Sequence, residues 1–490
     1  MKFNFDNSYA RLPDKFFARL APTPTPGPML IQVNHELALQ LGLDPAALES
    51  PEGVEILAGN RLPDGSDPLA MAYAGHQFGN WVPQLGDGRA ILLGEVVDRA
   101  GIRRDIQLKG AGRTPFSRMG DGRAILGPVL REYLVSEAMA ALGVPSTRAL
   151  AAVTTGMQIM RQGLQPGAVF TRVARSHVRV GTFEYFGNRG DVDAVRLLAD
   201  YVIERHYPHT AAAALPYGAL LDAVLEATAQ LIAQWQLVGF IHGVMNTDNT
   251  SVAGETIDFG PCAFMDTYDP QTVYSSIDTA GRYAFVNQPR IAHWNLAQFA
   301  QCLLPLLAPD EAAALSMGQS AINSFPARFQ NHLIDGMRKK LGFAQAADDD
   351  LMLIEDLLDR MARHRADFTL TFRYLCDAAV NRRFDDKVRS LFDEPSAFDD
   401  WALRWRERMA REAVGSEERR HAMRAVNPMY TPRNHQVERV IAAAQTHGDF
   451  QPFEELLGVL SAPFEDQPAF SRYSEPPRPE EEIQATFCGT

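Results

Sequence analysis

Two short segments in the second half of the chain carry residues suited to metal-assisted phosphate chemistry. The first begins at His242 and contains Asp248 and Asn249, and the second is the triplet from Asp258 to Gly260. The amide oxygen of Asn249 and the carboxylate of Asp258 are hard ligands, of the kind that Mg²⁺ or Mn²⁺ accepts while it also binds phosphates. Asp248 is a carboxylate that can take a proton from an attacking hydroxyl. These residues indicate transfer of a phosphate-containing group.

The spacing of these residues matches the catalytic loop and the metal-binding triplet of protein kinases. A kinase has H-R-D-x-x-x-x-N and then D-F-G. Here His242 and Asn249 are seven positions apart, and Asp258 opens a D-F-G triplet nine positions later. The kinase base lies two positions after the histidine, where this chain has Val244, which cannot accept a proton. Asp248 is therefore the nearest candidate base; the alternative is an Asx turn followed by a chance D-F-G.

Three upstream features stand in the order that a kinase-like site requires. Residues 86–89 (GDGR) precede an expected strand, where a glycine-rich phosphate loop would lie. Lys109 closes the next expected strand, and Glu132 lies 23 residues later on an expected helix. In kinases a strand lysine that pairs with a helix glutamate steadies the phosphates. Lys109 alone would be read as a surface lysine, but the order of the parts favours the phosphate site.

Two further features suggest additional anion-binding groups. The string GDGRAIL occurs at residues 86–92 and again at 120–126, which indicates either two Arg-bearing loops on one anion or two tight turns. Arg172, Arg175, His177 and Arg179 lie within eight residues. Strand geometry would put the last three on one face and Arg172 on the other. This cluster indicates either that phosphates are bound at an unusual place or that the basic residues form a solvated strand face.

Composition excludes several classes of protein. The chain has 490 residues, of which 46% are hydrophobic and 22% charged, as in a globular protein. Its formal net charge is −13, which argues against general binding to nucleic acid or to anionic membranes. The four cysteines form neither a disulfide framework nor a CxxC zinc pattern. We see no secretory signal and no span long enough to cross a membrane, and we expect a cytoplasmic protein.

Periodicity predicts an α+β chain with a strand-rich first half and a helical second half. We expect an antiparallel pair at 90–97 and 104–109, further strands at 151–160 and 168–173, and a helix at 129–142 that Gly143 ends. Later helices are expected at 220–238, 295–307, 310–324, 351–363 and 401–412. The proposed units are 1–215, an N-terminal extension with a nucleotide-binding lobe, then 216–462, a helical lobe, and 463–490, a flexible tail that carries Cys488.

Several longer motifs resemble the selenoprotein O family, the bacterial YdiU-type protein adenylyltransferases. They are FDNSY at 5–9, YAGHQFG at 73–79, LKGAGRTPFS at 108–117, REYL at 131–134, HGVMNTDN at 242–249 and Asn427-Pro428. The resemblance covers nearly the whole chain. It implies a protein-kinase-like two-lobed fold and transfer of AMP from ATP to Ser, Thr or Tyr hydroxyls of proteins. UMP transfer is a variant of this activity.

The resemblance also implies a role for each matching residue. Asp248 becomes the base, Asn249 and Asp258 hold Mg²⁺ or Mn²⁺, and Glu132 forms the structural ion pair. The implied nucleotide contacts are Gly86, Gly88, Arg89, Lys109, Asp121, Gly122, Arg172, Arg179 and Asp258. In this family ATP is inverted relative to kinases, which gives the second GDGR loop and the Arg cluster a use at the distal phosphates.

Redox control and partners are implied in the same way. In relatives the C-terminal tail is linked to the loop after D-F-G, so Cys488 and Cys262 are the expected pair here. We expect protein substrates and ATP as partners, a monomer, and no nucleic acid or membrane. The rival functions are an ordinary kinase-type phosphotransferase, which Val244 opposes, and a catalytically dead nucleotide-binding scaffold, which the intact Asn249 and Asp258 oppose.

Overall fold

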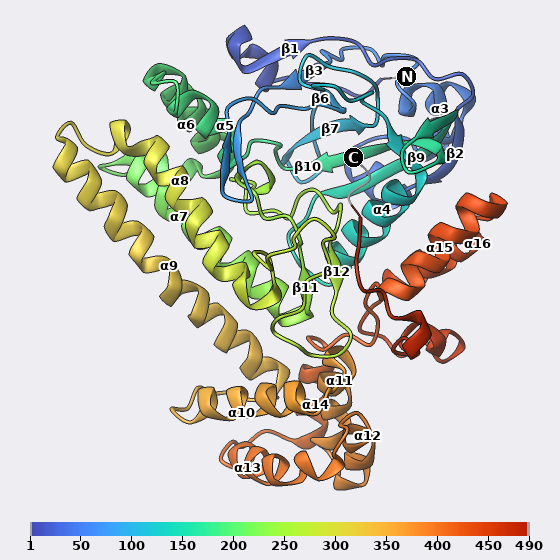
Figure 1. The fold of residues 1–490 in the computed structure, drawn as a ribbon. Coiled ribbons are helices and arrows are strands. Elements are labelled where there is room, and N and C mark those ends of the chain that lie inside the picture. The colour runs from blue at the N-terminus through green and yellow to red at the C-terminus, as the bar shows by residue number, and fades with distance from the viewer. Residues whose placement is uncertain (1, 488–490) are drawn as a thin grey trace.

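The computed structural model describes residues 2–487, and it combines a sheet-containing part with a helical part (Figure 1). This agrees with the predicted α+β class. The antiparallel sheet has the strand order β1-β3-β6-β7-β10-β9-β2, and β8 pairs with β10. Its strands are β1 Phe17–Arg19, β2 Met29–Val33, β3 Leu69–Met71, β6 Ala90–Val97, β7 Arg103–Lys109, β8 Ala124–Ile125, β9 Arg148–Met160 and β10 Leu164–Ala174.

The central hairpin of this sheet is the one predicted from sequence. Strands β6 and β7 pair antiparallel, with Ala90 opposite Lys109. Between them Gly101 adopts a positive φ of 79°, and the Asp98 carboxylate accepts hydrogen bonds from two backbone N–H groups of the turn. An Asx-type turn of this kind needs both a short acidic side chain and a glycine. The hairpin fixes Lys109 at the end of β7, beside the cleft described below.

Helix α4 (Leu126–Ala141) covers one face of the sheet and packs against β9 and β10. It begins three residues before the predicted start, and Gly143 follows it with a φ of 78°. Leu130 and Leu134 are buried in a core shared with α15 (Asn434–His447) and α16 (Gln451–Leu460). On the other face lie α1 (His35–Gln40), α2 (Pro45–Glu49) and α3 (Pro51–Leu57). Glu132 is thereby held on a packed helix.

The largest helical core joins α5 (Val180–Gly187), α6 (Val192–His206), α7 (Pro216–Val238), α8 (Gln288–Leu307) and α9 (Glu311–Lys340). Helices α5 and α6 precede residue 216, yet they pack in the same core as α7 and α8. Two short strands, β11 (Phe240–Ile241) and β12 (Ala263–Phe264), pair antiparallel beside α7. They flank the segment that contains residues 242–249, called the catalytic loop below after its kinase-like spacing, and the D-F-G triplet.

Helix α9 is longer than the predicted segment 310–324. The helix contains Pro326 and continues past it to Lys340 (Figure 1). Pro326 cannot donate to the carbonyl of Ile322 four residues earlier. That carbonyl instead accepts a hydrogen bond from His293 Nε2 at 3.0 Å, and the His293 ring stacks on Phe325. A tertiary contact therefore replaces the backbone bond that the proline removes.

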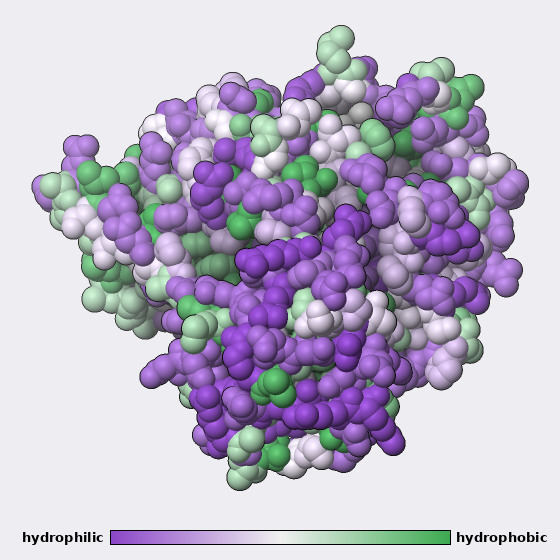
Figure 2. Space-filling model, turned by 60° about the horizontal axis from the view of Figure 1, so that its bottom comes forward, coloured by the Kyte–Doolittle hydropathy of each residue, from purple (hydrophilic) through white to green (hydrophobic). Residues whose placement is uncertain are grey.

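A second helical core lies beyond α9. It contains α10 (Asp350–Arg363), α11 (Phe368–Ala378), α12 (Asp385–Arg389), α13 (Asp399–Met409) and α14 (Ser416–Arg424). Trp401 and Trp405 stack at its centre and donate hydrogen bonds to backbone carbonyls of Leu353 and Leu341. Both side chains are fully buried core residues. Figure 2 shows that the outer surface of this end is mostly hydrophilic.

The C-terminal segment departs from its composition-based prediction. A flexible tail was expected from residue 463, but the described residues 463–487 pack against the rest of the chain. Tyr473 is buried beside α15 and α16, and Thr486 is fully buried. Thr486 bonds through its backbone N–H to the Tyr274 carbonyl and through its hydroxyl to the Pro261 carbonyl. No helix within the described residues is long and apolar enough to cross a bilayer.

Candidate active site

A cleft of about 650 Å³ lies between the sheet and the helical part, and it gathers residues that are far apart in the sequence. Both GDGR loops, the end of β7, β10, the catalytic loop and the D-F-G triplet line it. The sequence-predicted residues that line the cleft are Gly86, Gly88, Arg89, Lys109, Asp121, Gly122, Arg172, Arg179, Asp248, Asn249 and Asp258.

The inner part of the cleft is built around the Asp258 carboxylate. Its Oδ1 lies 2.6 Å from Arg172 Nη1 and 3.0 Å from Lys109 Nζ, and its Oδ2 lies 3.9 Å from Arg179. Burial alone would raise the pKa of Asp258, but the three cations hold that pKa well below its usual range. Asp258 is therefore an anion under all ordinary conditions, as a cation ligand or a phosphate-binding cluster requires.

Lys109 is shared between two carboxylates. Its Nζ lies 2.6 Å from Glu132 Oε2 on α4, and Glu132 Oε1 is 3.5 Å from Arg172. The strand–helix pair expected from the 23-residue spacing is thus present in the structure. Because Glu132 sits behind Lys109 on a packed helix, the ammonium is directed toward Asp258 and the cleft.

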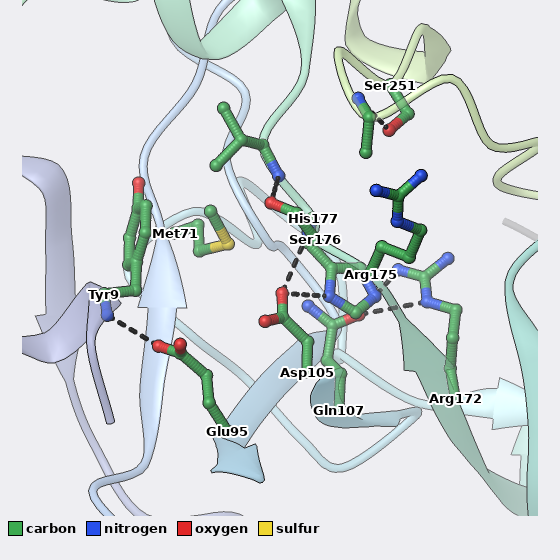
Figure 3. Close-up of polar contacts among 12 residues, drawn as sticks. Tyr9, Met71, Glu95, Asp105, Gln107, Arg172, Arg175, Ser176, His177 and Ser251 are labelled. Carbon is green, nitrogen blue, oxygen red and sulfur yellow. Dashed lines mark hydrogen bonds and ion pairs between the residues drawn. The ribbon is translucent and has the colours of Figure 1, made fainter. Parts of the chain in front are cut away.

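The sequence reasoning missed residues that support the two cleft arginines. Gln107 Oε1 accepts hydrogen bonds from Arg172 Nε at 3.1 Å and Nη2 at 2.6 Å (Figure 3). The Arg179 guanidinium lies 4.3 Å from the Tyr73 ring centroid and 3.7 Å from Asp87. Gln107 stands two positions before Lys109 on β7, so strand periodicity could have placed it on the cleft face. The role of Asp87 could have been inferred from its position inside the first GDGR string.

Both GDGR loops need glycine for steric reasons. Gly86 has a φ of 78°, and a Cβ there would lie 2.3 Å from the Phe116 ring. Gly122 has a φ of 70°, and a Cβ there would lie 2.1 Å from the carbonyl oxygen of Gly112. The segment at 112–117 is packed between the two loops, so both open onto one cavity. This arrangement favours two loops acting on the same ligand over two unrelated turns.

The second loop is also held by an ion pair. The Asp121 carboxylate accepts hydrogen bonds from both terminal nitrogens of Arg161, at 2.8 and 2.9 Å. The Arg161 guanidinium holds the pKa of Asp121 below its usual value. Arg161 lies at the end of the β9–β10 hairpin and lines the cleft as well. It is a further cleft cation that no motif indicated.

The catalytic loop presents two different polar groups. The Asn249 side chain donates to the Val244 carbonyl at 3.0 Å, which leaves its Oδ1 as an acceptor. Asp248 is buried, its Oδ2 accepts from Gln77 Nε2 at 3.2 Å, and its Oδ1 has no partner among the described residues. Burial raises the pKa of Asp248 to about 6. A carboxylate with this pKa is suited to accept a proton near neutral pH.

Comparison with known proteins identifies the family. The SelO model, described as protein adenylyltransferase SelO, matches residues 1–461. The chain belongs to the SelO family. Three relatives, each named protein nucleotidyltransferase YdiU, come from Rhodopseudomonas palustris strains HaA2 and BisB5 and from Bradyrhizobium sp. strain BTAi1. They are 62%, 63% and 62% identical over 488 residues, which span 100% of this chain and 99% of each relative.

These comparisons confirm the resemblance that the motifs predicted. As a SelO family member, the chain is an enzyme of the protein nucleotidyltransferase class. The family relationship covers the cleft-lining residues, because every one of them lies between residues 73 and 277.

One prediction about the Arg cluster of this SelO family member is wrong. Arg175 and His177 do not share a strand face with Arg179, because β10 ends at Ala174 and Ser176 turns the chain by accepting the Val178 N–H. His177 is buried and bonds through Nδ1 to Asp105 at 2.8 Å (Figure 3), and neither residue lines the cleft. Burial lowers the pKa of His177 to about 4, so the ring is neutral. Arg172 and Arg179 are the members of the cluster that line the cleft.

The described cysteines are all buried. Cys262 lies four residues after Asp258, and burial raises the pKa of its thiol to about 12. Cys302 and Cys376 pack in the two helical cores. Cys488 lies outside the described residues. Thr486, two positions before Cys488 in the sequence, donates a hydrogen bond to the carbonyl of Pro261. Pro261 is the residue directly before Cys262, so this part of the C-terminal segment lies close to Cys262.

Proposed function

We propose that this chain transfers AMP from ATP to Ser, Thr or Tyr hydroxyls of proteins, with ATP inverted relative to protein kinases. The proposed fold is kinase-like, with a nucleotide-binding lobe over residues 1–215, a helical lobe over 216–462 and a tail over 463–490. Supporting features are the Lys109–Glu132 pair on β7 and α4, and Asn249 and Asp258, which line the same cleft. Strand lysine, helix glutamate and two oxygen ligands are the parts of a kinase phosphate site.

The observation that best supports an inverted orientation of ATP is the deep burial of two arginine side chains. The side chains of Arg172 and Arg179 are only 1% and 2% exposed, and both face Asp258. A γ-phosphate that pointed outward to an acceptor could not use them. Groups buried this deeply suit the distal end of a triphosphate, where charge-assisted hydrogen bonds hold the leaving pyrophosphate. The α-phosphate then lies nearer Asp248.

A second observation opposes an ordinary kinase reaction. Val244 lines the cleft at the position of the kinase base, and it offers no proton acceptor. Asp248 is the carboxylate beside Asn249, and its raised pKa suits a base. Asp248 takes the proton as the acceptor oxygen attacks the α-phosphorus. The bond from that phosphorus to the bridging oxygen breaks, and the electron pair leaves with pyrophosphate, which Lys109 and the buried arginines hold.

The donor set fits Mg²⁺ or Mn²⁺. Asn249 Oδ1 is left as an acceptor, and Asp258 Oδ2 has only the distant Arg179 as a cationic neighbour. No group of three or more His, Cys, Asp or Glu side chains within residues 2–487 could hold a metal alone. Two protein oxygens, completed by phosphate oxygens and water, are typical of Mg²⁺ sites. When bound, the ion offsets negative charge on the phosphates.

The remaining parts of the proposal concern partners. Besides its protein substrates, we propose ATP as the main nucleotide, with UTP as a variant, and a monomer that works in the cytoplasm without nucleic acid or membrane. Support comes from the acidic composition and from the nucleotide-sized cleft.

The test is to incubate the enzyme with ATP, Mg²⁺ or Mn²⁺ and a mixture of candidate proteins, and to search tryptic peptides by mass spectrometry. We expect adenylyl groups on hydroxyl side chains, and their loss in Lys109→Met. The matched control is Lys15→Met, which removes a surface lysine paired with Asp191 and leaves transfer unchanged. Phosphoryl groups in place of adenylyl groups, or equal activity of Lys109→Met and wild type, contradict the proposal.

A further inference from the structure

Part of the cleft is lined by side chains that are not among the predicted nucleotide contacts. The cleft is also lined by Gln77 and Phe78 from the β4–β5 hairpin (Gly75–Gln77 and Asn80–Val82) and by Ile277. Gln77 donates a hydrogen bond to Asp248, so this side of the cleft meets the proposed base. Under the proposed function, an acceptor hydroxyl must approach Asp248 from this side.

The segment that carries Ile277 is held in a fixed shape. The Asp278 carboxylate accepts the backbone N–H groups of Arg282 at 2.9 Å and of Tyr283 at 2.8 Å. The Tyr283 hydroxyl donates to Asn246 Oδ1 at 2.5 Å, and the same Asn246 oxygen accepts the Phe78 N–H at 3.0 Å. Catalytic loop, hairpin and segment are thus linked, so the position of Arg282 relative to Asp248 is set by hydrogen bonds.

Arg282 lies on the outer side of this junction. A Cβ on Gly79 would lie 3.4 to 3.5 Å from its guanidinium, and that guanidinium lies 5.2 Å from the Trp294 ring centroid. Within residues 2–487, Arg282 forms no ion pair with a carboxylate, and its guanidinium also lies 5.8 Å from the Tyr283 ring centroid. The nearby carboxylates have other partners: Asp278 takes the backbone bonds just described, and Glu184 binds His76 and Thr247. A cation without a counter-ion is conspicuous in a chain with a net charge of −13.

Aromatic rings extend this surface. The His76 ring lies 5.0 Å from Trp81 and 5.1 Å from Trp294, and its Nδ1 is 2.6 Å from the buried Glu184 carboxylate. Trp81 is 37% exposed and Ile277 is 54% exposed. Exposed aromatic and apolar side chains around an arginine that has no carboxylate partner are typical of protein-binding surfaces.

We propose that Arg282, Trp81 and Trp294 form an acceptor-binding surface that selects protein segments with an Asp or Glu close to the modified hydroxyl. The carboxylate pairs with Arg282, and the segment lies on the two tryptophans. Arg282 is a specificity-determining residue, and it leaves the chemical step to Asp248 and the metal ligands. This inference rests on the proposed function and adds the class of acceptor to it.

The test uses pairs of acceptor peptides that differ only in the residues flanking one Tyr or Ser, with Asp in one peptide and Lys in the other. For wild type we expect kcat/KM for AMP transfer to favour the acidic peptide by about tenfold, the order of one charge-assisted hydrogen bond. Arg282→Gln should abolish the preference, and Arg282→Glu should reverse it. The KM for ATP should stay at its wild-type value, because Arg282 does not line the phosphate end of the cleft.

The matched control is Arg290→Glu. Arg290 lies on α8 with Trp294, is exposed, and forms no ion pair within the described residues, but it lines a separate groove. This variant should keep the wild-type preference for acidic peptides. An unchanged preference in Arg282→Glu, or equal effects of the Arg282 and Arg290 variants, overturns the inference while AMP transfer stands. A wild-type enzyme that transfers no AMP to any acceptor instead overturns the proposed function.

Discussion

Replacing Asp258 by Asn tests the role of its charge without changing its shape. Asp258 has a φ of 62°, a left-handed conformation that Asn tolerates and that would strain Ala. The change leaves Lys109, Arg172 and Arg179 with Glu132 and Asp87 as their remaining carboxylates. Removing one partner of a buried ion pair costs about 3 kcal/mol of folding stability.

The effect on activity should be larger than the effect on stability. Asp258→Asn removes a charged cation ligand beside the phosphates, so we expect AMP transfer to fall by about 10²- to 10³-fold. Calorimetry should show that Mg²⁺ no longer strengthens ATP binding. Turnover at the wild-type rate, or an undiminished effect of Mg²⁺ on ATP affinity, would refute the metal assignment.

A matched variant separates loss of charge from general loss of stability. Asp105 is also a buried carboxylate, paired with Arg205 at 2.5 Å and with His177 at 2.8 Å, and it lies outside the cleft. Asp105→Asn should lower the urea midpoint as Asp258→Asn does. It should leave the response of ATP binding to Mg²⁺ intact. Equal loss of the Mg²⁺ response in both variants would show that the measured effect comes from unfolding.

Three further predictions address the base, the acid stability and the tail. Asp248→Asn should reduce kcat by at least about 10²-fold while calorimetric ATP affinity stays within about twofold, and equal losses in both would place Asp248 among the metal ligands. The pKa of His177 is about 4 in the folded protein and 6.5 in the unfolded chain. The neutral ring therefore contributes fully to the free energy of unfolding above pH 6.5, and this contribution is lost as pH falls toward 4, by about 3 kcal/mol at most. Urea unfolding at pH 8 and pH 5 should therefore show a smaller pH effect in His177→Gln than in wild type, and equal pH effects would contradict this. Peptide mapping of oxidised, non-reduced protein should find Cys488 joined to Cys262, and a Cys488 that is always free would remove the redox prediction.

Local features of the sequence predicted the parts of the site that lie close together in the chain. The histidine-to-asparagine motif and the D-F-G triplet fall within 19 residues, from His242 to Gly260. Residues from both motifs line the cleft. The hairpin of β6 and β7 was predictable because alternating apolar residues flank a clear turn. The Lys109–Glu132 pair followed from a strand end and a helix of the right phase.

The missed features depend on contacts between distant segments. Gln77 reaches Asp248 across 171 residues, and Gln107 reaches Arg172 across 65, so no local pattern contains either contact. The helix continues through Pro326 because His293 on another helix satisfies a freed carbonyl.

The prediction of a flexible tail from composition was wrong for the described residues for a related reason. A segment rich in Pro, Glu and Ser is predicted to be mobile when considered alone. Buried contacts of Thr486 with the loop after D-F-G, and of Tyr473 with α15 and α16, hold the described part in place.

The most direct test of the central claim is which phosphate of ATP reaches the acceptor. Parallel reactions with ATP labelled at the α- or the γ-phosphate should place only the α-label on protein. The acceptor should gain about 329 Da, the mass of one adenylyl group, and pyrophosphate should be released. A γ-label on protein, with a gain of about 80 Da and release of ADP, would show that the chain is a kinase and that Arg172 and Arg179 do not hold the distal phosphates.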